Sequence, residues 1–116
     1  LADVLLMKAE AILRGATNGT AAEALTAANE VRKRAFPINP EKHFTTSTLT
    51  LDAIYKERGL EFTFEVTRRT DMIRFGKWED AMLFKPANPS ETHKRIFPIP
   101  ATALANNGNL TPNPGY

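Results

Sequence analysis

The sequence contains no cysteine, carries little net charge and has no long apolar run. The absence of cysteine excludes thiolate zinc sites, iron–sulfur clusters and a cysteine nucleophile. It leaves the redox compartment undecided, because oxidising compartments permit disulfides without requiring them. With 15 Lys and Arg against 13 Asp and Glu, the net charge of +2 is too small to indicate nucleic-acid binding. No apolar stretch approaches ~18 residues, so no membrane-spanning helix is predicted.

Signatures of nucleotide-binding proteins, hydrolases and metalloenzymes are also missing. Neither G-x-S-x-G nor G-x-G-x-x-G occurs, and Gly76-Lys77 lacks the preceding glycine of a phosphate-binding loop. His43 and His93 are the only histidines, and neither has a second ligand at a metal-binding spacing. We therefore expect both histidines on the surface, and no catalytic, cofactor or metal site.

The length of 116 residues, 42% of them hydrophobic, predicts one globular unit whose core needs neither disulfides nor metal. Its first residues, Leu1 to Met7, already have a helical pattern, although no initiator methionine, signal peptide or N-cap residue precedes them. We therefore expect a piece of a longer protein, with any export signal or lipid anchor outside it.

A helical hairpin is predicted at the start of the chain. Strong helix formers and apolar residues at helical spacing predict a helix over 1–14, which Gly15 ends. Thr20 and Glu23 fit a capping box, in which hydroxyl and carboxylate satisfy each other's exposed backbone N–H groups. A second helix therefore begins there and ends before Pro37. The hairpin has the size of one tetratricopeptide unit of ~34 residues, although it lacks that repeat's consensus.

The second predicted helix has a basic last turn and a stripe of small side chains, and a loop follows it. Its last turn carries Arg32-Lys33-Arg34, where the helix dipole favours cations. The segment after it, 36–50, has two prolines and no periodicity, which predicts a loop lying over the helices. A narrow stripe of mostly small side chains would let another helix approach closely, and it consists of Ala21, Ala24, Leu25, Ala28 and Val31.

Two more helical segments are predicted before Lys85. Apolar residues at helical spacing predict a third helix over 51–66, with Thr50 or Thr48 as its cap. Gly59 within it costs ~1 kcal/mol of helix stability relative to alanine. A glycine at such a position indicates a packing reason, and we predict a close backbone crossing with another helix there.

The next segments are shorter. A helix is predicted over 69–75, closed by Gly76, and one or two further helical turns are expected over 78–84. The fold class predicted for residues 1–84 is therefore mostly α, built from helical hairpins of tetratricopeptide-like character.

After Lys85 the composition changes, because six of the eight prolines fall there together with several asparagines. Such a segment cannot be mainly helical, yet it is too apolar for a disordered tail. We predict an extended, ordered arm over 85–116 with a short turn at 101–105, and we expect Phe97 and Leu110 to pack on the helices.

Charged residues concentrate in the third predicted helix and just after it. Glu61 and Glu65 could be read as the acid and base of a glycosidase, since such chemistry uses two carboxylates. Residues four apart on one helix lie side by side, however, and interleaved arginines would keep both carboxylates ionised. We therefore predict a partly buried structural ion-pair network of Glu57, Arg58, Glu61, Glu65, Arg68, Arg69, Asp71 and Arg74.

Trp78 is the candidate glycan-binding residue, because an exposed indole face can stack on a sugar ring. Its position beside Phe75 and Phe84 favours a place in the core over this ligand role. With one tryptophan and two tyrosines, the chain alone is expected to bind glycans weakly. The uncapped first helix is expected to expose apolar surface and to self-associate as a homodimer.

Five motifs stand in order along nearly the whole chain, at Leu1–Ala11, Asn29–Ala35, Leu51–Phe62, Arg68–Gly76, and Phe97–Pro100 with Asn113–Tyr116. In that order they resemble the C-terminal part of the SusD/RagB family. Family members are several times longer than this chain, and no glycan-binding residue can be carried over from them. The matching charged residues correspond to the family's scaffold.

The resemblance implies a mostly helical, non-enzymatic lipoprotein without cofactor, anchored in the outer membrane of Bacteroidetes and facing the cell surface. Such proteins capture oligo- or polysaccharide for uptake through a SusC-like TonB-dependent transporter, which is the implied partner. The alternative, from another class, is a helical-hairpin module that binds protein and has no sugar role.

Overall fold

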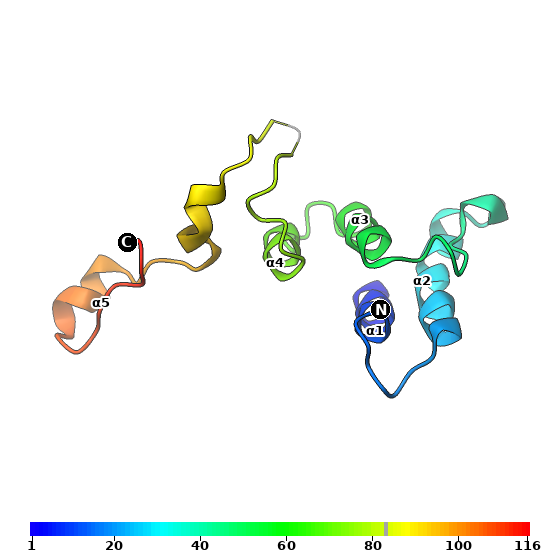
Figure 1. Ribbon diagram of the computed structural model, residues 1–116, viewed down its shortest axis with the longest axis horizontal. Helices are drawn as coiled ribbons and strands as arrows, with labels where there is room; N and C mark the ends of the chain where they lie inside the picture. Colours follow the sequence, from blue (N-terminus) through cyan, green and yellow to red (C-terminus); the bar gives the residue numbers. More distant parts are fainter. Residues whose placement is uncertain (83) are drawn as a thin grey trace. The chain divides into compact units, whose positions relative to one another are not determined.

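A computed structural model describes residues 1–82 and 84–116 (Figure 1). In this part of the chain there are five α-helices, two short 3₁₀ helices, no β-strand and one isolated bridge between Met82 and Lys85. The predicted mostly α fold is therefore confirmed. The chain forms two compact units, 1–68 and 69–116, which are described separately.

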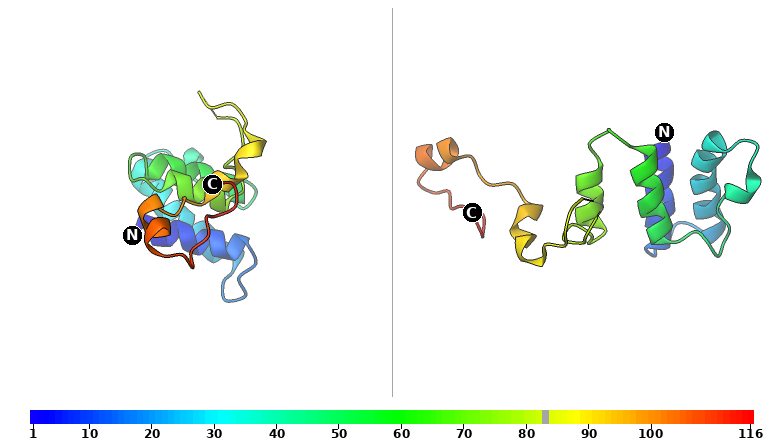
Figure 2. Two further views of the ribbon diagram at one scale, coloured as in Figure 1. Left: turned by 90° about the vertical axis from the view of Figure 1, so that its left-hand side faces the viewer. Right: turned by 90° about the horizontal axis from the view of Figure 1, so that it is seen from above.

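The first unit begins with the predicted hairpin of α1 (Ala2–Leu13) and α2 (Ala21–Ala35), which run in opposite directions (Figure 2). Gly15 follows α1 in the left-handed conformation, with φ of 97°. The capping box of α2 is present: the Glu23 amide donates to Thr20 Oγ1 at 3.2 Å, and the Thr20 amide donates to Glu23 Oε2 at 2.9 Å. These two bonds satisfy N–H groups that have no partner inside the helix.

Small side chains bring the helices of the first unit together. α1 packs against both α2 and α3 (Leu51–Glu61). On α2 the buried positions are Ala24, Ala27, Ala28 and Val31, whereas Ala21 of the predicted stripe is exposed and Leu25 is half-buried. The other buried apolar side chains of this unit are Leu6, Ala9, Leu49, Ile54, Tyr55 and Phe62.

The loop 36–50 contacts α2 through hydrogen bonds to Asn29 and Arg32, and it contains the 3₁₀ helix η1 (Pro40–Lys42). The Asn29 side chain of α2 holds it at Phe44. Asn29 Nδ2 donates to the Phe44 carbonyl at 2.9 Å, and the Phe44 amide donates to Asn29 Oδ1 at 2.7 Å. The loop ends at Thr50, whose Oγ1 accepts from the Ala53 amide and so caps α3.

The third helix ends at Glu61, so the predicted extension to Val66 is wrong. The Thr63 hydroxyl donates to the carbonyls of Gly59 and Leu60 at 3.0 and 2.9 Å, and so occupies acceptors that further helical turns would use. The chain then takes left-handed conformations at Phe64 and Val66, which are 99% and 89% exposed.

Gly59 does allow a close approach, but not the predicted crossing of a helix backbone. A Cβ atom at this position would lie 2.7 Å from Nη1 and 3.0 Å from Cζ of Arg68. The space left by the missing side chain is therefore taken up by a guanidinium group.

The second unit contains most of α4 (Arg68–Arg74), which ends before Gly76 in the left-handed conformation, as predicted. The expected helical turns over 78–84 are absent from the residues described there, and Leu83 lies outside the described residues. Lys85 Nζ donates instead to the carbonyls of Trp78 and Asp80 at 2.6 and 3.1 Å. An ammonium group thus takes two carbonyls that a helix would have needed.

The rest of the second unit is extended, interrupted by the 3₁₀ helix η2 (Pro89–Arg95) and by α5 (Ala101–Asn106), where a turn was predicted. Phe97 and Leu110 are 71% and 39% exposed, so they are not buried against the helices, although the Phe97 ring does lie 4.2 Å from the guanidinium carbon of Arg69 on α4. The arm is held by polar bonds to its own backbone. Asn113 Nδ2 donates to the Phe97 carbonyl at 2.8 Å, and the Tyr116 hydroxyl donates to the Ile96 carbonyl at 2.8 Å.

Among the described residues, none of the helices combines the length and apolar character that crossing a lipid bilayer requires.

Candidate functional site

Two glutamates of α3 pair with arginines from the last turn of α2. Glu57 accepts a hydrogen bond from Arg32 Nη1 at 2.8 Å, and Glu61 accepts one from Arg34 Nη2. Glu57 is only 6% exposed, and this burial raises the pKa of its carboxyl, although the attraction of Arg32 acts in the opposite direction. The two ion pairs tie the C-terminal ends of α2 and α3 together.

Arg58 of α3 reaches the first turn of α1. Its side chain is buried, Nη1 donates to Asp3 Oδ1 at 2.7 Å, and its guanidinium carbon lies 5.1 Å from the centre of the Phe62 ring. Asp3 is about half exposed, so this ion pair joins a buried cation to a partly solvated anion.

Arg68 and Glu65 form no ion pair within residues 1–82 and 84–116. Arg68 Nη1 donates to the Tyr55 carbonyl at 2.9 Å, and its guanidinium carbon lies 3.8 Å from the centre of the Tyr55 ring. Glu65 is exposed and lies beyond the end of α3.

In the second unit, Asp71 and Arg74 pair with each other: Arg74 Nη2 donates to the buried Asp71 carboxylate at 2.7 Å. Arg69 takes a different role. Its Nη2 donates to the carbonyls of Lys94 and Arg95 at 2.8 and 3.1 Å, which fixes the end of η2 beside α4. The structure therefore gives the charged residues predicted as one network several kinds of partner, including carboxylates, carbonyls and aromatic rings.

Trp78 is half-buried and lies among cations. The Arg69 guanidinium carbon is 5.1 Å from the centre of its ring and 4.2 Å from that of Phe97, and Lys85 Nζ is 5.7 Å from the Trp78 ring centre. We refer to Arg69, Trp78, Lys85 and Phe97 as the Trp78 cluster. It combines two aromatic rings with two cations, which is the chemistry of a surface that stacks and hydrogen-bonds a polar ring.

An ion pair borders the Trp78 cluster. Arg95 Nε and Nη2 donate to the two carboxylate oxygens of Glu79, both at 2.7 Å. This two-point hydrogen bond, more than charge attraction alone, lowers the pKa of Glu79 and raises that of Arg95. Glu79 therefore stays ionised and engaged with Arg95 at neutral pH.

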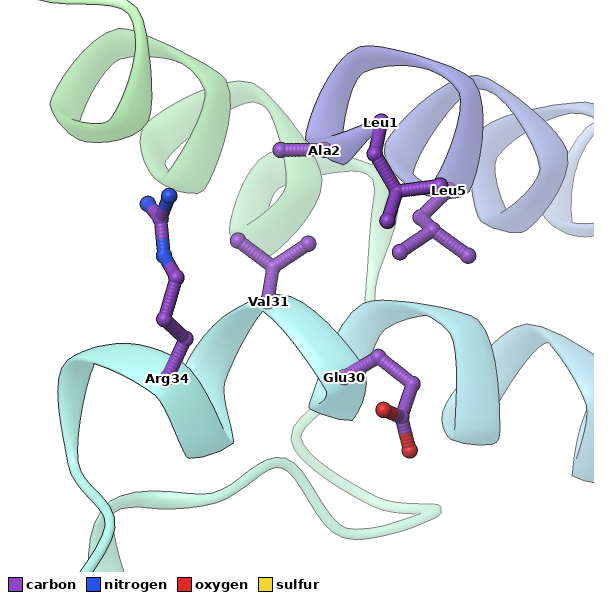
Figure 3. A pocket seen from close by; sticks show the side chains of 6 residues that line it. All are labelled: Leu1, Ala2, Leu5, Glu30, Val31 and Arg34. Carbon is purple, nitrogen blue, oxygen red and sulfur yellow. The ribbon is translucent and has the colours of Figure 1, made fainter.

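Two of the cavities in the first unit differ in the side chains that line them. One, of about 100 Å³, lies between the start of α1 and the end of α2, where Figure 3 shows Leu1 and Leu5 facing Val31. The other, of about 380 Å³, is lined by Lys56, Gly59, Leu60 and Arg68. Most residues that line the smaller cavity are apolar, whereas the larger has two cations on its wall.

The two histidines are half-buried, not fully on the surface as predicted. His43 Nε2 lies 3.0 Å from the Phe36 carbonyl, and the His93 ring meets the Tyr116 ring edge-on with centroids 5.1 Å apart. Within the described residues, no group of three or more histidine, aspartate or glutamate side chains could hold a metal ion.

Several functional partners were not predicted from the sequence. Arg32 and Arg34 were interpreted only as cations that favour a helix C-terminus, and Asp3 only as part of a helical pattern. Lys85 was not linked to Trp78, although an aromatic residue and a cation seven residues apart across a turn were the available signal.

Comparison with known proteins identifies the family. The model of the SusD family matches residues 1–116. The chain is 32% identical, over 125 aligned residues, to the starch-binding protein SusD of Bacteroides thetaiotaomicron. That match covers the whole chain but 20% of the relative, so the chain spans about one fifth of the length of the curated relative it matches. The family resemblance predicted from five motifs is confirmed, and the chain belongs to the SusD family.

Proposed function

We propose that this chain is part of a glycan-binding protein at the cell surface, which captures oligo- or polysaccharide and passes it to a SusC-like TonB-dependent transporter. The observation that supports this proposal is the family match over every residue of the chain, together with 32% identity to a starch-binding protein. In this proposal the full-length protein is lipid-anchored in the outer membrane and faces outward. It carries out no catalysis and needs no cofactor.

Within that protein we assign this chain to the C-terminal portion. The first unit supplies scaffold, because three of its ion pairs join one helix to another. The second unit supplies the Trp78 cluster, whose aromatic rings and cations suit contact with a sugar.

Calorimetric titration of the full-length protein with plant and host glycans tests the binding function. We expect saturable binding of at least one glycan, and weaker binding by the Trp78→Ala variant if this chain contacts the sugar. The matched control is Phe36→Ala, an aromatic truncation in the loop of the first unit. Failure of the folded full-length protein to bind any glycan would contradict the proposal.

Purification of the full-length protein from its own outer membrane in mild detergent tests the transporter. We expect a TonB-dependent transporter to copurify with it. The alternative function, a module that binds protein and no sugar, is favoured if a protein partner copurifies while the calorimetric titration shows no glycan binding.

A further inference from the structure

Neither cation of the Trp78 cluster forms an ion pair with a carboxylate in the part of the chain that the structure describes, although Lys85 lies near enough to Glu79 for its charge to help lower the pKa of that carboxyl. Arg69 hydrogen-bonds to two backbone carbonyls, and Lys85 does the same. Carboxylates elsewhere in this unit are engaged with other cations: Asp71 with Arg74, Glu79 with Arg95, and Glu91 with Lys94. The Asp80 carboxylate is exposed and forms no ion pair with a described residue.

Counting the donors shows how much hydrogen-bonding capacity is left. A lysine ammonium group has three N–H donors and an arginine guanidinium group has five. Two carbonyls take up two donors of Lys85 and at most two of Arg69. At least one N–H of Lys85 and three of Arg69 are therefore left for an acceptor from outside the described chain.

The same two cations lie against an aromatic surface. Trp78 is half-buried and Phe97 is 71% exposed, so the aromatic surface of the cluster is partly open to solvent. A sugar that stacks its C–H face on Trp78 would bring its substituents close to Lys85 and Arg69, since both lie within 5.7 Å of the ring centre. A carboxylate on that sugar would gain charge-assisted hydrogen bonds, which are about twice as strong as neutral ones.

We propose that the Trp78 cluster binds an acidic sugar, a uronic acid residue of a polysaccharide. The sugar ring stacks on Trp78, and its carboxylate accepts hydrogen bonds from Lys85 and Arg69. This inference rests on the proposed function, to which it adds the chemical class of the glycan. A neutral sugar would leave both cations without a direct ion pair.

Trp78 is the only tryptophan of the chain, so tryptophan emission, excited where the two tyrosines do not absorb, reports on this site alone. The 116-residue chain is titrated with trigalacturonic acid and, separately, with its methyl ester, which has the same ring shape without the charge. We expect a saturable change of tryptophan emission with the acid, binding at least tenfold weaker with the ester, and weaker binding of the acid as salt is raised.

Three lysine variants locate the anion site. Lys85→Gln should weaken binding of the acid at least fivefold, whereas Lys85→Arg, which keeps the charge, should retain most of it. Lys56→Gln removes the same charge from the cavity beside Arg68 in the first unit and should have no effect. Thermal unfolding of each variant establishes that it is folded.

Each contrary outcome has a distinct meaning. Equal affinity for the acid and the ester overturns the inference and leaves the proposed glycan binding intact. Loss of binding in Lys56→Gln but not in Lys85→Gln overturns it, because the anion would then bind in the cavity beside Arg68. No response to either sugar also overturns it, while the glycan titration of the full-length protein decides the proposed function independently.

Discussion

At Glu57 two physical effects act on one carboxyl in opposite directions. Burial raises its pKa, and the ion pair with Arg32 lowers it, with burial the larger effect. A carboxyl whose pKa is raised on folding contributes stability that is complete below its ordinary pKa and is lost as pH rises through the raised value. Arg32 therefore limits how much stability the domain loses when Glu57 ionises.

We predict that Arg32→Met raises the pKa of Glu57 further, because it removes the largest interaction that favours the ionised form. The measurement is a ¹³C NMR titration of the glutamate carboxyl groups. Arg34→Met is the matched control. It removes an equal charge from the same helical turn, but Arg34 pairs with Glu61 and not with Glu57. A Glu57 pKa that stays unchanged in Arg32→Met would contradict the assignment of this pair.

Gly59 and Arg68 form a second coupled pair at the residue scale. We predict that Gly59→Ala destabilises the parent chain, because its Cβ would lie 2.7 Å from Arg68 Nη1 and displace a guanidinium that stacks on Tyr55. In an Arg68→Met background the same substitution should stabilise the chain by about 1 kcal/mol, the usual preference of a helix for alanine over glycine.

Urea denaturation of the parent, both single variants and the double variant gives the coupling free energy of Gly59 and Arg68. The same change in unfolding free energy in both backgrounds would mean that Arg68 does not occupy the space beside Gly59.

At the scale of elements, the start of α2 depends on one short-range motif. We predict that Thr20→Ala lowers the free energy of unfolding by about 1 kcal/mol, because it removes the hydroxyl that accepts from the Glu23 amide. Chemical denaturation measures this. Thr46→Ala, at an exposed loop position of the first unit, is the control and should have little effect. Equal effects of the two substitutions would show that the cap contributes nothing.

The elements that local chemistry determines could be predicted from the sequence. α1, α2 and α4 follow from helical spacing, the Thr20 cap and the glycines at 15 and 76. The end of α3 was missed because periodicity continues to Val66, while the Thr63 hydroxyl competes for the backbone carbonyls. The arm was predicted as extended because proline excludes long helices, and its two short helices are too brief to leave a periodic signal.

The candidate site was less predictable than the fold, for a geometric reason. Trp78 could be singled out by residue type, but its cationic neighbours come from α4 and from the far side of a turn. The partners of Glu57 and Glu61 lie 25 and 27 residues away. A single sequence shows which charges exist, whereas pairing across helices depends on how the helices are arranged.

At the scale of the whole molecule, apolar side chains at Leu1 and on α1 lie in solvent. Leu1 is 95%, Val4 61% and Met7 45% exposed. We predict that the chain associates with a second copy through this face, since clustered exposed apolar surface favours a partner. Light scattering over a range of concentrations should show a dimer, and the double variant Val4→Gln, Met7→Gln should shift it to monomer. A parent chain that is monomeric at every concentration would contradict this prediction.

Asn29 anchors the loop 36–50, and this affects which insertions, deletions and substitutions the loop can accept. Its amide offers Phe44 one donor and one acceptor, as a neighbouring strand would, and the hydrogen bonds fix which way the amide faces. Asn29 thereby divides the loop 36–50 into two shorter loops. The entropy cost of closing a loop depends only weakly on its length. Insertions or deletions between Pro37 and His43 should be accommodated. Replacing Asn29 with aspartate, which has no N–H to donate, should remove the bond to the Phe44 carbonyl and leave the bond from the Phe44 amide and that from Arg32 Nε to the Lys42 carbonyl.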